Sequence, residues 1–161
     1  MGKTTFSIET TEQPANQEKI KLDLVIDANV MRLYSEPKDL TIKKLFIWLY
    51  NDGSLAISHA MLNEYNRHGN KLIFGLIQHL TKNGRITSVT NDKIKNFTAD
   101  KKIKYTCNPE DIEHAKLVFL SIRKKLISFD DKLVNDINSA PKISKIKPSA
   151  SNRPIAEQFY L

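Results

Sequence analysis

The chain has 161 residues, 40% of them hydrophobic and 27% charged, which is an ordinary composition for one globular domain. A single cysteine, Cys107, excludes an internal disulfide and a metal site built from several cysteines, and it is typical of a reducing compartment. No apolar run approaches the roughly 20 residues that span a bilayer, so we expect a cytoplasmic protein. The formal net charge of +7 favours a polyanionic partner such as nucleic acid.

Three segments follow one another along the chain. Residues 1–20 are polar and rich in Thr, Gln and Glu, which predicts a flexible leader. Residues 21–147 are expected to form one domain, and residues 148–161 a C-terminal tail. Within the domain short apolar strands alternate with helical segments, and this pattern predicts a three-layer α/β fold with a parallel sheet flanked by helices.

The first strand is predicted over about residues 21–26, because residues 24–26 form an unbroken apolar run of the kind buried on both faces of a sheet. Asp27 follows directly, and Asn29 comes two residues later. A carboxylate at the carboxyl end of a central parallel strand lies where open α/β sheets place their chemistry. Asp and Asn are also favoured helix caps, so a capping role stays open for both residues.

The next part of the chain predicts three helices and two strands. The helices are one opened by residues 39–41 and ended by residues 51–53, one over 59–68 and one over 70–82, and the strands cover 55–57 and 85–89. Trp48 falls on the apolar stripe of the first helix and is expected in the core. Glu64 lies in the second helix, where an isolated glutamate is most often a solvated surface residue.

In the C-terminal half, the sequence pattern before residue 108 predicts secondary structure only weakly, and the pattern from residue 108 onward predicts it clearly. Residues 108–111, Asn-Pro-Glu-Asp, are a strong helix start, with an N-cap, a proline at N1 and acids in the first turn. The remaining elements are expected as follows: a short helix over 92–97, a lysine-rich loop over 101–104, a fourth strand at 126–127, a helix over 132–137, a fifth edge strand over 143–147, a linker over 148–151 and a last helical turn within 154–161.

Four acids occupy mechanically similar places in this pattern. Asp27 and Asp130 each follow a predicted strand, Asp111 lies in the first turn of a helix, and Glu64 lies within the helix after the second strand. Bringing such carboxylates together is costly through mutual repulsion unless a cation offsets it. Oxygen ligands suit Mg²⁺ or Mn²⁺, and such an ion activates water and stabilises charge on a phosphoryl group during hydrolysis.

The ordered pattern of these motifs resembles the PIN domain over about residues 22–137. The motifs are Val-Ile-Asp27-Ala-Asn29-Val, Ser58 followed by Asn-Glu64-Tyr, Asp111 opening a helix, and Ile-Ser128-Phe-Asp130. The resemblance implies a five-stranded parallel sheet in the order 3-2-1-4-5, with the strands that end at Asp27 and Asp130 side by side. It further implies a Mg²⁺- or Mn²⁺-dependent endoribonuclease acting on single-stranded RNA. The catalytic, metal-binding acids would then be Asp27, Glu64, Asp111 and Asp130, with Asn29 and Ser128 holding them in position.

The resemblance also implies partners. Many bacterial members of the family are toxins paired with a small antitoxin protein, and dimers are common, so we expect an RNA substrate, an antitoxin and a homodimer as partners. Two alternatives remain open at the level of residues, because Asp131 competes with Asp130 and Glu110 competes with Asp111.

Two other functions compete with the nuclease. The first is a non-catalytic PIN-like module that binds RNA or protein, which the net charge suits equally well. The second is another phosphotransfer enzyme of the doubly wound class, which is disfavoured because Asp27-Ala28-Asn29 lacks the second acid of an Asp-x-Asp phosphatase.

The histidines and the cysteine carry little signal. His59 and Glu64 lack the spacing of a zinc site, and His114, three positions after Asp111, is expected to face solvent rather than bind a metal. A nucleophilic role for Cys107 is disfavoured because no supporting histidine pattern accompanies it.

Overall fold

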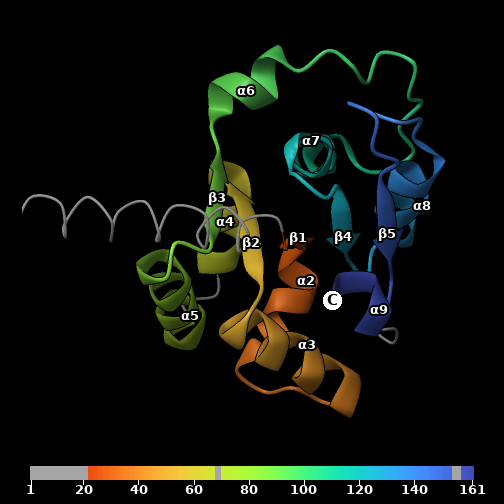
Figure 1. Ribbon diagram of the computed structural model, residues 1–161. Helices are drawn as coiled ribbons and strands as arrows, with labels where there is room; N and C mark the ends of the chain where they lie inside the picture. Colours follow the sequence, from red (N-terminus) through yellow and green to blue (C-terminus); the bar gives the residue numbers. More distant parts are fainter. Residues whose placement is uncertain (1–21, 68–69, 154–156) are drawn as a thin grey trace, which may run out of the picture.

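Five parallel strands form one sheet in the computed structural model, which describes residues 22–67, 70–153 and 157–161. The strands are β1 (Asp23–Ile26), β2 (Ser54–Ser58), β3 (Ile86–Val89), β4 (Lys125–Ile127) and β5 (Ser149–Ser151). Their order is β3-β2-β1-β4-β5 and every pairing is parallel (Figure 1). This confirms the α/β fold and the strand order expected from the sequence.

Helices cover both sides of this sheet. They are α2 (Ala28–Met31), α3 (Leu40–Asn51), α4 (His59–Asn66), α5 (Lys71–Lys82), α6 (Asn91–Asn96), α7 (Ile112–Leu120), α8 (Asp131–Ser139) and α9 (Glu157–Tyr160), with short 3₁₀ turns η1 (Arg32–Tyr34) and η2 (Pro109–Asp111). The chain runs outward from β1 through β2 to β3, and then crosses to the other half of the sheet, where β4 and β5 follow. In the view of Figure 1, α6 and α7 lie towards the top of the domain and α3 and α5 towards the bottom.

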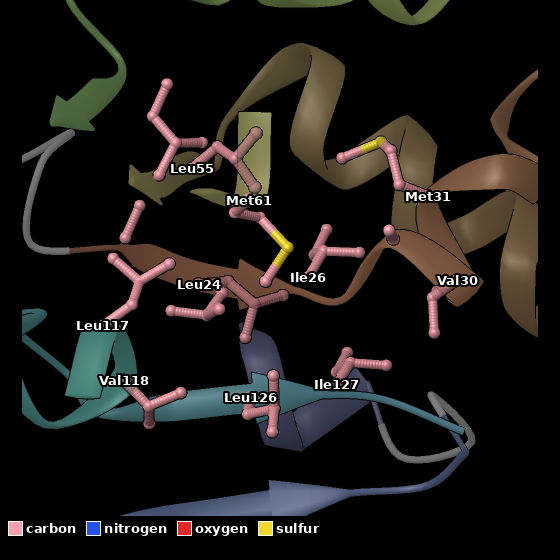
Figure 2. Packing of buried hydrophobic residues seen from close by; sticks show 14 of the residues in the cluster. Leu24, Ile26, Val30, Met31, Leu55, Met61, Leu117, Val118, Leu126 and Ile127 are labelled. Atoms are coloured by element: carbon pink, nitrogen blue, oxygen red, sulfur yellow. The ribbon is translucent and has the colours of Figure 1, made fainter. Parts of the chain in front are cut away.

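The core is centred on β1. Leu24, Val25 and Ile26 have no exposed surface, as expected for a strand buried on both faces. Figure 2 shows β1 packed between side chains of β2 and β4, with Met61 of α4 and Leu117 of α7 packed over it. This burial fixes the direction in which the strand delivers the next residue, Asp27.

Trp48 lies in the core, which confirms its predicted place. Its ring packs on Tyr160 of α9 at a centroid distance of 4.9 Å. It also covers Gly53, where an added Cβ would stand 2.6 Å from the indole, so the turn after α3 requires glycine for reasons of space. The last helical turn of the chain is therefore part of the folded domain, although residues 154–156 of its predicted range lie outside the described residues.

The fifth strand is not where the sequence predicts it, so the expectation of an edge strand over 143–147 is wrong. Ile143 and Ile146 form only an isolated antiparallel bridge, around a tight turn in which Ser144 and Lys145 have positive φ values of 50° and 71°. The edge strand that pairs with the outer side of β4 is β5, in the segment predicted to be a linker. The residues of β5 are Ser-Ala-Ser, so the sequence there has no apolar run that would predict a strand.

Two expectations concern the chain as a whole. The predicted leader, residues 1–20, lies outside the described residues. In the part of the chain that the structure describes, every helix is too short or too polar to cross a membrane.

Candidate metal centre

Asp27 stands where β1 and β4 end side by side. Its backbone N–H donates to the carbonyl of Ile127 at 2.9 Å, so the pairing of the two strands continues through it. Its carboxylate is 6% exposed, with Oδ1 accepting from the N–H of Ala28 at 2.8 Å and Oδ2 accepting from Ser128 Oγ at 2.6 Å. The carboxylate therefore caps α2, and a buried serine holds its second oxygen.

Ser128 connects this carboxylate to Asp130. Its Oγ accepts from the Asp130 N–H at 3.0 Å, and Asp130 Oδ1 caps α8 by accepting from the N–H groups of Lys132 and Leu133. Asn29 adds a second link between the strand ends, because its Oδ1 accepts from the Phe129 N–H at 3.2 Å. The ends of β1 and β4, the start of α8 and the side chains of Ser128 and Asn29 thus form one hydrogen-bonded unit.

The neighbouring acid Asp131 lies apart from this unit. It is the first residue of α8, it is exposed, and its Oδ1 accepts from Asn152 Nδ2 at 3.1 Å. Of the two alternatives that the sequence left open, Asp130 is the one bonded to Ser128.

Glu64 reaches the same edge of the sheet from α4. Ser58 caps this helix by accepting from the Met61 N–H at 3.1 Å, and the Tyr65 hydroxyl donates to the carbonyl of Ile26, which fixes α4 against β1. Burial, followed by the charges of Asp27 and Glu64, raises the pKa of Tyr65 well above its ordinary value. Glu64 is therefore a partly buried neighbour of Asp27 rather than a solvated surface residue.

His114 lies beside Glu64, so the expectation that it faces solvent is wrong. Its side chain is 1% exposed and its Nε2 lies 3.3 Å from Glu64 Oε1. The reason is visible in α7, where Leu117 and Val118 are buried three and four positions later and lie on the same face of the helix. This spacing was present in the sequence and would have placed His114 on the buried stripe.

Among the described residues, one group of side chains is close enough to share a metal ion. One ligand atom from each of Asp27, Glu64 and His114 lies within 4.8 Å of the others. The structure thus adds a histidine to two of the four predicted acids, while Asp111 and Asp130 stand outside this tightest group.

Asp111 nevertheless shares the electrostatic environment of the group. Its pKa is raised to about 6, chiefly by burial; the charge of His114 opposes this rise, and the charges of Asp27, Asp130 and Glu64 contribute to it. Its side chain makes no capping hydrogen bond, whereas its rival Glu110 is exposed at the rim of a neighbouring hollow. All four predicted acids therefore lie around the carboxyl edge of β1 and β4.

The donor set fits a divalent cation. Two carboxylates and an imidazole are ordinary ligands for such an ion, and neither ring nitrogen of the buried His114 has a hydrogen-bond partner among the described residues. Carboxylates gathered in a partly buried place are also costly, because burial and then the charges of neighbouring acids disfavour the charged form, as in the raised pKa of Asp111. A bound cation would give the His114 ring a partner and would offset the negative charge of the clustered carboxylates.

Two hollows flank the cluster. The larger, of about 820 Å³, is lined by ten residues, among them Asn29, Phe129, Lys38 and Arg153. The smaller, of about 370 Å³, is lined in part by Glu64 and His114. The larger hollow contains none of the four acids and meets their site only through Asn29 and Phe129.

Cys107 does not have the properties of a nucleophile. It is buried, and burial followed by its contact with Asp136 raises the pKa of its thiol to about 12. The thiol therefore stays protonated at neutral pH, which agrees with the expectation from sequence.

No protein-family model matches the chain, and a search of curated proteins finds no match. Membership of the PIN family therefore stays a prediction from the sequence, and what the protein does must be inferred from the chemistry of its site.

Proposed function

We propose that the protein is a metal-dependent nuclease that hydrolyses phosphodiester bonds in single-stranded RNA. The observation that carries this proposal is the convergence of Asp27, Glu64, Asp111 and Asp130 around the carboxyl edge of a parallel sheet, beside a hollow with basic side chains. A cation bound there would activate water and stabilise charge on the scissile phosphate.

The chain's own residues have distinct tasks in this proposal. Asp27 and Glu64 would hold the ion, Mg²⁺ or Mn²⁺, and Asp111 and Asp130 would add negative charge close to it. Ser128 fixes the Asp27 carboxylate, and Asn29 fixes the loop that carries Phe129. These hydrogen bonds orient the acids before an ion or a substrate arrives.

The surroundings of the acids suit a single-stranded substrate. Phe129 stands between Ser128 and Asp130 and is 42% exposed, so its ring is available for a base to stack on. Lys38 and Arg153 line the same hollow and would contact phosphates on either side of that base. A nuclease needs this combination of anionic ligands for the ion and cationic contacts for the strand.

The test is cleavage of a labelled single-stranded RNA by the purified full-length chain, with and without Mg²⁺ or Mn²⁺. Asp27→Asn keeps a side chain that caps α2 but removes the charge, so we expect cleavage to fall to the metal-free level with little change in folding. Asp131→Asn is the matched control, because this neighbouring acid is exposed, and it should cleave like wild type.

The nuclease assignment is wrong if wild type does not cleave RNA, or if cleavage persists in EDTA and in Asp27→Asn. One observation favours the second candidate, a non-catalytic RNA-binding module: the larger hollow is lined by Lys38, Arg153 and Asp39 but by none of the four acids of the proposed metal site. RNA binding that depends on salt, without uptake of a divalent ion, would identify that module.

Two further partners belong to the proposal only through the resemblance to the PIN domain. They are a small antitoxin protein and a second copy of the chain. Co-purification from the native host and the mass of the purified protein in solution test these two predictions separately from catalysis.

A further inference from the structure

His114 is a buried polar side chain whose ring nitrogens make no hydrogen bond with any residue that the structure describes. It is 1% exposed, and among the described residues neither Nδ1 nor Nε2 makes a hydrogen bond. A buried polar group left in this state is destabilising, so such groups in native proteins usually have a function or an additional partner.

The ring points toward the candidate metal centre. Nε2 lies 3.3 Å from Glu64 Oε1, and ligand atoms of Asp27, Glu64 and His114 all lie within 4.8 Å of one another. Two ligands that each lie about 2.1 Å from one ion are about 3.0 Å apart at an angle of about 90° and about 3.4 Å apart at about 109°. The spacing between Nε2 and Oε1 is therefore that of two neighbouring ligands on a shared ion.

We infer that His114 Nε2 is a direct ligand of the metal ion, together with Asp27 and Glu64, and that the site prefers a transition-metal ion such as Mn²⁺ over Mg²⁺. This inference rests on the proposed function, because it assigns a further ligand to the same site. Neither the four-acid pattern nor the resemblance to the PIN domain contains this histidine.

The preference for a transition ion follows from the change in donor atoms. Carboxylates are ordinary ligands for both Mg²⁺ and Mn²⁺, whereas an imidazole nitrogen is a ligand typical of transition metals. Mg²⁺ binds oxygen and gives up its water reluctantly, so a nitrogen ligand adds little to its affinity. His114 therefore gives the site a higher affinity for Mn²⁺ than for Mg²⁺, a difference that the four acids alone do not provide.

The experiment measures the ligand atoms of bound Mn²⁺ directly. Electron spin echo envelope modulation detects a nitrogen bonded to Mn²⁺, and protein labelled with ¹⁵N-histidine identifies that nitrogen as a histidine's. We expect nitrogen modulation in wild type and in His59→Asn, which removes an exposed histidine of α4, and none in His114→Leu or His114→Gln.

Calorimetric titration with each ion gives the second readout. In His114→Leu the affinity for Mn²⁺ should fall by at least about tenfold while that for Mg²⁺ changes by less than about threefold. His114→Gln offers an amide oxygen in place of Nε2, so it should still bind both ions with a smaller preference for Mn²⁺.

The outcomes separate this inference from the proposed function. Mn²⁺ bound by wild type without nitrogen modulation overturns the His114 assignment and leaves a carboxylate site intact. Binding of neither ion by wild type, or binding unchanged in Asp27→Asn, overturns the metal site itself. If His114→Leu does not fold, the spectra of wild type, His59→Asn and His114→Gln still decide the question.

Discussion

At the scale of single residues, Ser128 sets the geometry of the candidate metal centre. Its hydroxyl donates to Asp27 Oδ2 at 2.6 Å and accepts from the Asp130 N–H at 3.0 Å, and it is completely buried. Ser128→Ala removes both bonds without adding volume. We expect the affinity for Mn²⁺ in calorimetric titration to fall by about 10–100-fold, because an unrestrained Asp27 carboxylate is a poorer ligand.

Ser121 supplies the control for this variant. It is also buried, and its hydroxyl donates to the carbonyl of Val118 at 2.6 Å, away from the acids. Ser121→Ala should lower the free energy of unfolding by about 1 kcal/mol and leave metal affinity unchanged. Equal losses of metal affinity in the two variants would mean that Ser128 acts only through general stability.

The sequence predicted where Asp27 and Asp130 lie better than it predicted where His114 lies. Asp27 and Asp130 follow from a simple rule, because Asp27 comes directly after β1 and Asp130 comes three residues after the end of β4, at the carboxyl edge of a parallel sheet. The expectation that His114 faces solvent is wrong because it overlooks an equally simple rule, the spacing of the buried face of α7. The contact between His114 and Glu64 depends on how α7 packs against α4, which no local pattern contains.

At the scale of secondary-structure elements, Asp136 links α8 to the segment that leads to Asp111. From α8 its carboxylate accepts from the backbone and hydroxyl of Thr106 and from the Cys107 N–H, at 2.6 to 3.1 Å. Burial opposes its charge, but these hydrogen bonds prevail and hold the pKa of Asp136 below its ordinary value. The carboxylate thus fixes the chain just before η2, the turn that carries Asp111.

We expect Asp136→Asn to lower the free energy of unfolding by about 2–3 kcal/mol at pH 7, because an amide cannot accept all of these bonds. A lowered native pKa means that this stabilisation is complete above the unfolded pKa of about 3.9 and is lost as pH falls through the native pKa. In urea denaturation at several pH values, the difference from wild type should therefore shrink as pH falls below about 4.

Asp92→Asn, an exposed change on α6, should alter stability by no more than about 0.5 kcal/mol at any pH. A difference between Asp136→Asn and wild type that stays constant down to pH 2 would contradict the assigned role of the Asp136 charge.

The elements that the sequence could not predict depend on distant partners. β5 is short and polar, and it exists because β4 offers an edge and because Asn138 of α8 bonds both the N–H and the carbonyl of Ala150. The apolar Ile143 and Ile146 looked more like a strand, but a turn with two positive φ values lies between them. By contrast, β1 and its neighbours were predictable because burial on both faces leaves an apolar run in the sequence itself.

The charge of the whole molecule is divided between two surfaces. The net charge of +7 includes the acids gathered at one edge of the sheet, so the remaining surface is more basic than the total suggests. Lys38 and Arg153 bring that charge to the hollow beside Phe129. If this hollow is the path of a single strand, then electrostatic attraction there and not the average charge controls RNA binding.

This distinction is measurable as the salt dependence of RNA binding in EDTA, where cleavage cannot occur if the ion is essential. Each phosphate contact of a single strand contributes about 0.7 to the slope of log affinity against log salt. Lys38→Ala and Arg153→Ala should each lower the slope by about that amount. Lys82→Ala changes an exposed lysine of α5 outside the hollow and should leave the slope unchanged, because contacts and not net charge set it. A slope lowered equally by all three changes would mean that RNA is held by diffuse charge, and the strand path past Phe129 would then be wrong.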